Sequence, residues 1–223
     1  MAQPLPSDDK AEEVPGISQQ RVIIPNEHGE KLVGVLHETG SKKLAILCHG
    51  FRASKDDKTL LNLTAALTRQ GISAFRFDFP GNGESEGAFQ YGNYRREADD
   101  LHAVVLYWSK QKYEVSAIIG HSKGKDEYRV TEESLMDRLN TDMHAASLSI
   151  DKACRVLTVH GSEDEIIPTE DALEFAKLIP NHKLHIIEGA NHCYTAHQEE
   201  LASVVVGFIK FDQVEDASAV GDV

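Results

Sequence analysis

The sequence predicts an α/β protein with a mostly parallel sheet and flanking helices, and three observations support this. Short apolar runs alternate along the chain with segments in which apolar residues recur every three to four positions. Several of the runs are continuously apolar, as is typical of strands covered on both faces. The strict alternation favours parallel strands joined by right-handed crossovers. A length of 223 residues suits one domain with a sizeable core.

Seven apolar runs are predicted to be strands. The first two, residues 21–24 and 31–37, flank a short polar turn that contains Gly29, and this arrangement predicts an antiparallel hairpin. The other five strands are expected at residues 44–48, 72–77, 116–119, 155–160 and 184–187.

Four segments carry the apolar stripe of a helix that packs on a sheet. They contain Leu60, Leu63 and Leu67; Ala98, Leu101, Val105 and Trp108; Leu173, Ala176 and Ile179; and Leu201, Val204, Val205 and Phe208. Ser54 and Asp56 are candidate caps for the first helix, and Pro180 is expected to stop the third.

The ends of the chain differ in composition from its centre. Residues 1–20 are rich in proline and polar residues and predict a disordered leader, and residues 213–223 predict a flexible tail. The domain is therefore expected at residues 21–212. Within it, residues 125–152 are predicted to form a truncated helical cap, with one apolar turn at Leu135, Met136 and Leu139 and another at Met143, Ala146 and Ile150.

Charge and composition exclude several classes of protein. With 23 basic and 36 acidic residues the net charge is −13, which argues against nucleic acid or an anionic membrane surface as a partner. No apolar run approaches the roughly 18–20 residues that a membrane-spanning helix needs. The three cysteines are scattered and lack the spacing of metal ligands, and the first ten residues do not resemble a secretory signal. A cytoplasmic setting is expected.

The clearest chemical pattern is Gly120-x-Ser122-x-Gly124 directly after an apolar strand. This pattern is typical of a nucleophile elbow, in which a strand ends in a tight turn that exposes the serine hydroxyl. The tightness of the turn predicts that both flanking positions require glycine. A simple Gly/Ser turn without catalytic function is the alternative interpretation.

Three further segments follow predicted strands. His49-Gly50-Phe51 follows residues 44–48, Asp164 follows residues 155–160, and His192 follows residues 184–187. Because the carboxyl ends of parallel strands meet at one edge of a sheet, we expect these segments to converge on Ser122.

In this order the motifs resemble those of the α/β-hydrolase superfamily. The matching stretches are His49-Gly50-Phe51, Asp78-Phe79-Pro80-Gly81-Asn82-Gly83-Glu84-Ser85, Gly120–Gly124, His160-Gly161-x-x-Asp164 and Asn191-His192. Within the superfamily the chain is most similar to the serine aminopeptidase-like, monoacylglycerol lipase-like and feruloyl-esterase-like branch, from about residue 21 to residue 210.

The resemblance implies a serine hydrolase that cleaves carboxylic esters of small molecules through an acyl-enzyme, with no cofactor and no metal. Ser122 is the expected nucleophile, His192 the general base and Asp164 the residue that orients it. Backbone N–H groups of Phe51 and Lys123 are expected to form the oxyanion hole.

Other residues could hold two of these roles. Glu163 and Glu165 flank Asp164, and Asp78 also ends a strand, although it precedes the serine and more plausibly holds the turn at residues 80–83. Chain order leaves three further candidates for the base, which are His182, His185 and His197.

Two other chemistries are disfavoured. The eleven histidines form no His-x-x-x-His or His/Cys cluster, and the Gly81-Asn82-Gly83 stretch lacks the third glycine of a dinucleotide fingerprint. Cys193, next to His192, is expected to be a packing residue.

The spacer between the serine and the acid departs from the family pattern. Asp164 follows Ser122 by only 42 positions, residues 123–131 are strongly charged, and no strand is predicted between residues 123 and 152. We therefore expect the helix and the strand that normally follow the elbow to be absent, so that the sheet has one strand fewer than usual and carries unpaired edges. A compact variant with a short cap is the alternative. A damaged site makes an impaired or inert hydrolase isoform, or a small-ligand binding module, the alternative function.

Overall fold

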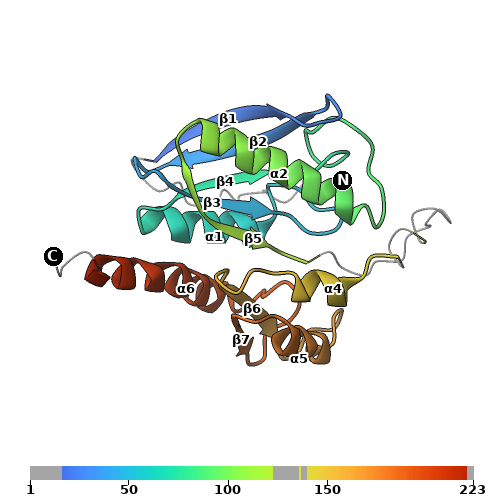
Figure 1. Cartoon of the computed structure of the whole chain (residues 1–223), viewed down its shortest axis with the longest axis vertical. Helices are drawn as coiled ribbons and strands as arrows, with labels where there is room; N and C mark the ends of the chain where they lie inside the picture. The colour runs from blue at the N-terminus through green and yellow to red at the C-terminus, as the bar shows by residue number, and fades with distance from the viewer. Residues whose placement is uncertain (1–16, 123–135, 137–139, 220–223) are drawn as a thin grey trace, which may run out of the picture.

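The computed structural model describes residues 17–122, 136 and 140–219 (Figure 1). The described strands are β1 (Ser18–Pro25), β2 (Lys31–Glu38), β3 (Lys43–Cys48), β4 (Ser73–Phe77), β5 (Glu114–Gly120), β6 (Val156–Gly161) and β7 (His182–Ile187). The described helices are α1 (Lys58–Arg69), α2 (Tyr94–Lys110), α4 (Met143–Leu148), α5 (Thr169–Leu178) and α6 (Gln198–Ala219). Each of the seven predicted strands is present.

Five strands form one mixed sheet in the order β1-β2-β4-β3-β5. The β1–β2 and β2–β4 pairs are antiparallel, whereas β3 pairs in parallel with both β4 and β5. All five residues of β4 are buried because helices cover both faces of the sheet. The predicted α/β class is therefore confirmed.

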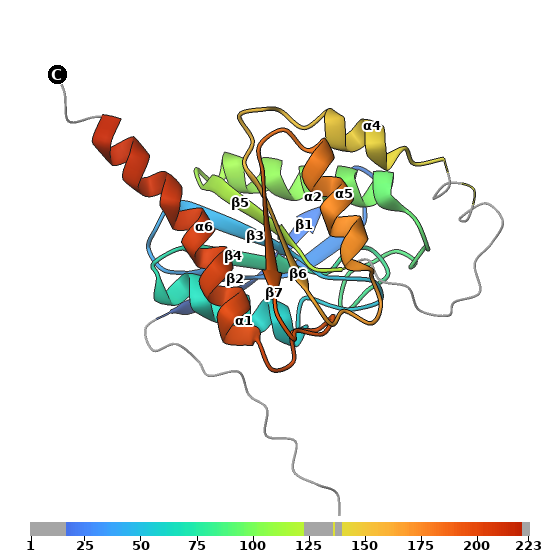
Figure 2. The same cartoon turned by 90° about the horizontal axis from the view of Figure 1, so that it is seen from below.

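Two apolar cores lie on opposite faces of this sheet. Helices α1 and α6 cover one face and α2 covers the other (Figures 1 and 2). In the first core Leu63 of α1 and Leu201 of α6 pack in one cluster. In the second, Trp108 of α2 packs edge-on against Phe75 of β4, with ring centroids 4.9 Å apart. These helices present the stripes that the 3.6-residue periodicity predicts.

The last two strands form a separate parallel sheet, β6–β7. Strand β5 pairs only with β3 among the described strands, and β6 pairs only with β7. As a result β5 is the least covered parallel strand, and Ile118 at its centre is 55% exposed. The break falls at the position where the short spacer predicts a missing strand.

Three local predictions are wrong. Strand β1 begins at Ser18, inside the predicted leader, because residues 18–20 pair with the end of β2. Helix α6 continues to Ala219, past the start of the predicted tail at residue 213. The cap of α1 is Asp57, whose carboxylate accepts hydrogen bonds from two N–H groups of the first turn.

The predicted cap segment, residues 125–152, is described only in part. Its described residues contain the short helix α4 and no strand. Leu135, Leu139 and the charged residues that follow Ser122 lie outside the described residues. Among the described helices, none has the length and apolarity needed to cross a membrane.

Candidate active site

Ser122 lies immediately beyond β5 in a strained backbone conformation. Its φ is +30°, in the left-handed region that residues other than glycine rarely adopt. Strain of this kind is typical of a nucleophile held on a tight turn. Glycine is not required at position 120, contrary to the sequence prediction, because an added Cβ there would meet nothing within 4 Å.

The structure brings Ser122, His192 and Asp164 together from the ends of β5, β7 and β6. Nε2 of His192 lies 2.6 Å from Oγ of Ser122, and Nδ1 of His192 lies 2.8 Å from Oδ2 of Asp164. The side chains of His192 and Asp164 are only 10% and 6% exposed. A chain of hydrogen bonds therefore runs from a buried carboxylate through an imidazole to a hydroxyl.

The loop after β6 holds Asp164 in its ionised form. Burial alone raises the pKa of this carboxyl, but hydrogen bonds from the Ile167 N–H, the His192 ring and the Ile166 N–H outweigh it, so the pKa lies below the ordinary 3.8. Both backbone bonds are 2.8 Å long and end on Oδ1, which leaves Oδ2 for the imidazole. The two backbone hydrogen bonds thus fix the orientation of the carboxylate independently of the imidazole.

This lowered pKa predicts a pH dependence. Because the folded state holds the Asp164 carboxylate more strongly than the unfolded chain does, its contribution to stability is complete above pH 3.8 and is lost as pH falls through the lower folded pKa. A ¹³Cγ NMR titration, assigned with Asp164→Asn, should give a midpoint below 3.8. A midpoint above 3.8 would contradict the arrangement.

The candidate oxyanion loop follows β3 and touches the elbow. Gly50 approaches so closely that a Cβ on it would lie 2.2 Å from the Ser122 carbonyl oxygen. The Phe51 N–H donates a 2.9 Å hydrogen bond to that same oxygen. Phe51 therefore lies at the predicted edge, but its amide can serve an oxyanion only after the Ser122 carbonyl turns away. Lys123, the second predicted donor, lies outside the described residues.

A buried ion cluster that the sequence analysis missed supports this loop. Lys55 is 4% exposed, and its Nζ lies 2.9 Å from Oδ2 of Asp78 and 2.8 Å from Oε1 of Glu84. The Lys55 N–H also bonds Asp78, at 2.6 Å. Asp78 thus has a structural role and is not the acid of the site. No local pattern identifies the Lys55–Asp78 pair, which is 23 positions apart along the chain.

The other candidates for the base and the acid occupy different environments. His182 bonds Oγ1 of Thr158 at 2.8 Å, on the strand pair and away from Ser122. Glu165 accepts the backbone N–H of His192 at 3.2 Å, so it helps to hold the base without contacting the imidazole ring through that bond. Burial, followed by the nearby carboxylates, raises the pKa of Cys193 and keeps its thiol protonated.

Two further histidines surround the site. The His121 ring lies 5.7 Å from the His192 ring, centroid to centroid. Nε2 of His160 lies 3.1 Å from the Ile167 carbonyl and 3.6 Å from Oδ2 of Asp164. Among the described residues, no group of three or more His, Cys, Asp or Glu side chains could hold a metal ion.

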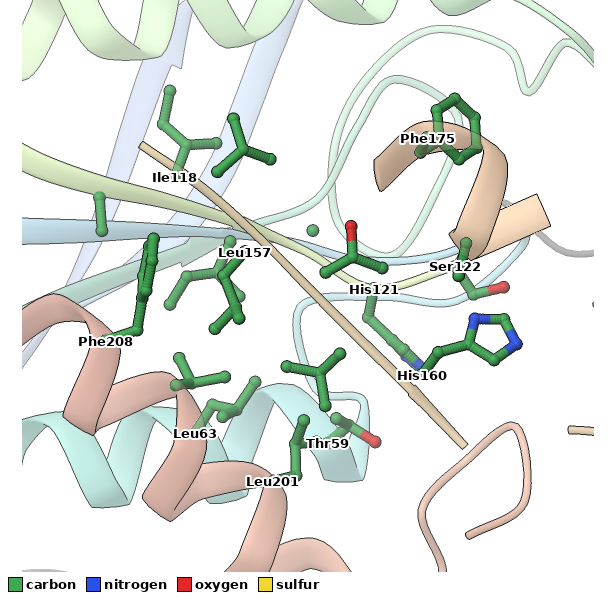
Figure 3. Close-up of a pocket in the computed structure, with 18 of the residues that line it drawn as sticks. Thr59, Leu63, Ile118, His121, Ser122, Leu157, His160, Phe175, Leu201 and Phe208 are labelled. Atoms are coloured by element: carbon green, nitrogen blue, oxygen red, sulfur yellow. The ribbon is translucent and has the colours of Figure 1, made fainter. Parts of the chain in front are cut away.

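A cavity of about 1000 Å³ opens beside the serine (Figure 3). It runs between β5 and β6, with Ser122 and His160 at one end and Phe208 of α6 at the other. Most of the helix residues that line it are apolar, including Leu63, Leu201 and Phe175.

Comparison with known proteins gives three findings. A family model described as serine aminopeptidase, S33, matches residues 39–125. The protein YfhR of Salmonella typhi is 25% identical over an alignment that covers 57% of this chain and 57% of that protein, so the chain spans little more than half of this curated relative.

Solved structures are similar over most of the chain. Est1E from Butyrivibrio proteoclasticus, solved with ferulic acid, gives a TM-score of 0.74 at 21% identity and covers 87% of this chain and 99% of that one. The esterase Pf2001 of Pyrococcus furiosus gives 0.72 at 21% identity, covering 87% and 92%. XC6422 from Xanthomonas campestris, described as an α/β serine hydrolase without a lid, gives 0.63 at 19%, covering 86% and 92%. The chain therefore has the α/β-hydrolase fold, and residues 39–125 of it match the serine aminopeptidase, S33, family model.

Proposed function

We propose that the protein is a serine hydrolase that cleaves carboxylic esters of small molecules through an acyl-enzyme. The observation that carries this proposal is the pair of hydrogen bonds from His192 to Ser122 and to Asp164, at 2.6 and 2.8 Å. The esterase names of two structural relatives point to the same substrate class.

In the proposed reaction, Oγ of Ser122 attacks the ester carbonyl carbon while Nε2 of His192 takes the hydroxyl proton. The tetrahedral intermediate then collapses, the C–O bond to the alcohol breaks, and His192 returns the proton to the leaving alcohol. Water, activated by the same imidazole, hydrolyses the acyl-enzyme and releases the carboxylic acid. Asp164 accepts a hydrogen bond from Nδ1–H of His192, which holds the imidazole in the required tautomer. Its negative charge stabilises the imidazolium.

A covalent probe tests the nucleophile directly. We expect a fluorophosphonate to label the full chain at one site, with loss of labelling in Ser122→Ala and retention in two controls. Ser116→Ala removes a second serine of β5, and Cys193→Ala removes the thiol beside the base. Mass spectrometry of the labelled peptide identifies the modified residue. Equal labelling of Ser122→Ala and the wild type would reject Ser122 as the nucleophile.

Replacing Asp164 should reduce the rate of ester hydrolysis without preventing folding. Asp164→Asn keeps the shape of the side chain but removes the charge that stabilises the imidazolium and directs its tautomer. We expect kcat for a short-chain aryl ester to fall by roughly 10³–10⁴-fold, with little change in KM. Glu165→Gln is the matched control because Glu165 accepts only the backbone N–H of His192 in the described bonds, and it should lose less than about tenfold.

A catalytically impaired member of the superfamily is the second candidate, and one observation favours it. The Phe51 amide, the oxyanion donor expected on this loop, donates to the Ser122 carbonyl. Loss of one oxyanion donor typically costs about 10²–10³ in rate. Fluorophosphonate labelling with negligible ester turnover would support this second candidate, since labelling needs an activated serine but less of the remaining machinery.

A further inference from the structure

The cavity between β5 and β6 runs along the strands' backbone edges. It is lined by every residue from Val115 to Ser122 and from Ala153 to His160. A cavity over one face of a sheet is lined by alternate residues, since successive side chains point to opposite faces. Lining by consecutive residues on both strands therefore places the opening between two strand edges. We call this opening the β5–β6 slot.

The ladder bonds of β5 identify the backbone groups that face the slot. The N–H of His121 donates to the carbonyl of Cys48 on β3 at 3.2 Å. In a parallel ladder, successive residues direct their N–H and C=O groups to opposite neighbours. Ile118 and Gly120 therefore direct both of their backbone groups away from β3 and into the slot.

The same argument applies to β6. The N–H of Val156 donates to the carbonyl of Asn181 beside β7 at 2.8 Å. Val156 therefore faces β7. Because successive residues of a parallel strand face opposite neighbours, Leu157 and Val159 direct their N–H and C=O groups into the slot. The Val159 carbonyl accepts a 2.7 Å bond from the Tyr194 hydroxyl. Among the described residues, the backbone groups of Ile118, Gly120 and Leu157 make no hydrogen bond outside their own sheets.

The two slot-facing edges come together at their carboxyl ends, and the slot has room for one strand. Ser122 follows β5 and Asp164 follows β6, and both lie within hydrogen-bond distance of His192, so the carboxyl ends of the two strands lie side by side. A strand of six residues is about 20 Å long, occupies ~4.8 Å between neighbours and is about 10 Å deep across both faces, which is roughly 950 Å³. The slot measures about 1000 Å³.

We propose that the β5–β6 slot binds one extended, apolar peptide segment of another polypeptide, which runs parallel to both strands and joins the two sheets into one. An extended backbone supplies N–H and C=O groups on both sides, which an acyl chain or another apolar ligand does not. The side chains of such a strand would face apolar layers, with Ile118 and Phe175 on one side of β6 and Leu63, Leu201 and Phe208 on the other (Figure 3).

The chain's own undescribed stretches do not have this chemistry. Residues 1–16 contain three prolines and four acidic residues, and residues 123–139 are rich in charge, whereas both faces of the slot call for aliphatic or β-branched side chains. The occupant is therefore expected from outside the chain. The proposal does not rest on the proposed function, because peptide binding is measured directly, although a bound peptide would occupy the cavity that opens beside Ser122.

The test uses a fluorescent peptide of six alternating valines and isoleucines with two lysines at each end. Fluorescence anisotropy with the full chain should give saturable binding. A second peptide has the same sequence but is N-methylated at all three valines, which alternate with the isoleucines. It keeps its apolar surface but loses the N–H donors along one edge, and it should bind at least roughly tenfold more weakly. Equal binding of the two peptides would show an apolar pocket without strand pairing and would overturn the proposal.

Protein variants test each edge separately. Ile118→Pro removes a slot-facing N–H of β5 and leaves the β3 ladder intact, and Leu157→Pro does the same on β6. Each should weaken peptide binding by roughly tenfold or more. Ile118→Val keeps the N–H, so it should weaken binding far less than Ile118→Pro does. Because the two peptides are compared on the wild-type protein, misfolding of a proline variant leaves that result intact.

Two results would reject the proposal on the wild-type protein alone. The first is no saturable binding of the unmodified peptide. The second is a dimer in sedimentation velocity that the peptide dissociates, because a second copy of this chain would then be the occupant of the slot.

Discussion

Ser122→Ala is expected to lower turnover of a short-chain aryl ester by roughly 10⁴–10⁶-fold. The hydroxyl forms the covalent intermediate in the proposed mechanism, and its Oγ is the atom that His192 approaches at 2.6 Å. Alanine supplies no nucleophile, so only positioning and electrostatic effects on a water-attack pathway would remain. The loss should appear in kcat, because the substrate still enters the same cavity.

Folding should be unaffected or slightly improved by this change. Alanine at position 122 loses one side-chain hydrogen bond and keeps the backbone conformation, so thermal unfolding should move by no more than a few degrees. The matched control, Ser116→Ala, should keep its turnover within about twofold. A Ser122→Ala protein that retains most of the wild-type rate would assign the hydrolysis to another residue or to a contaminant.

The order of the site residues could be predicted because it depends on strand periodicity. Apolar runs locate β5, β6 and β7, and in a parallel sheet the residues after such runs meet at one edge. This placed Ser122, Asp164 and His192 near one another without knowledge of any contact. The broken sheet was also predictable, since residues 123–131 are strongly charged and residues 123–152 contain no apolar run for another strand.

Contacts between remote residues could not be predicted in the same way. The buried Lys55–Asp78 pair joins a loop to the end of β4, and neither residue stands in a distinctive pattern. The bond from the Phe51 N–H to the Ser122 carbonyl depends on the approach of two loops by a fraction of an ångström. The prediction that the tight turn requires glycine at position 120 also failed, because a Cβ there would meet nothing within 4 Å, and such open space depends on the tertiary arrangement.

The broken sheet should make the chain unstable when it is expressed alone. Strand β5, which is normally covered on both edges in a parallel sheet, has one free edge and an isoleucine that is 55% exposed. Ile118 and Leu157 direct backbone groups into the slot and not to a neighbouring described strand, and each hydrogen bond that such a strand would add contributes about 0.5–1.5 kcal/mol. Whole-domain stability is usually only about 5–15 kcal/mol. The hydrogen bonds and apolar contacts that a strand between β5 and β6 would add are therefore comparable to the whole free energy of unfolding.

We therefore expect the purified chain to show a weak near-UV circular dichroism spectrum, a broad thermal transition below ~50 °C, and ester turnover far below that of a relative with an unbroken sheet. Far-UV circular dichroism should retain strand and helix signals, because the β1–β5 sheet has its own two apolar cores. Saturating apolar peptide should sharpen and raise the transition, since a ligand that binds only the folded state stabilises it by mass action. A cooperative transition above ~50 °C without peptide, together with ordinary esterase rates, would show that the two sheets form a stable compact design as they stand, and the prediction of a damaging deletion would be wrong.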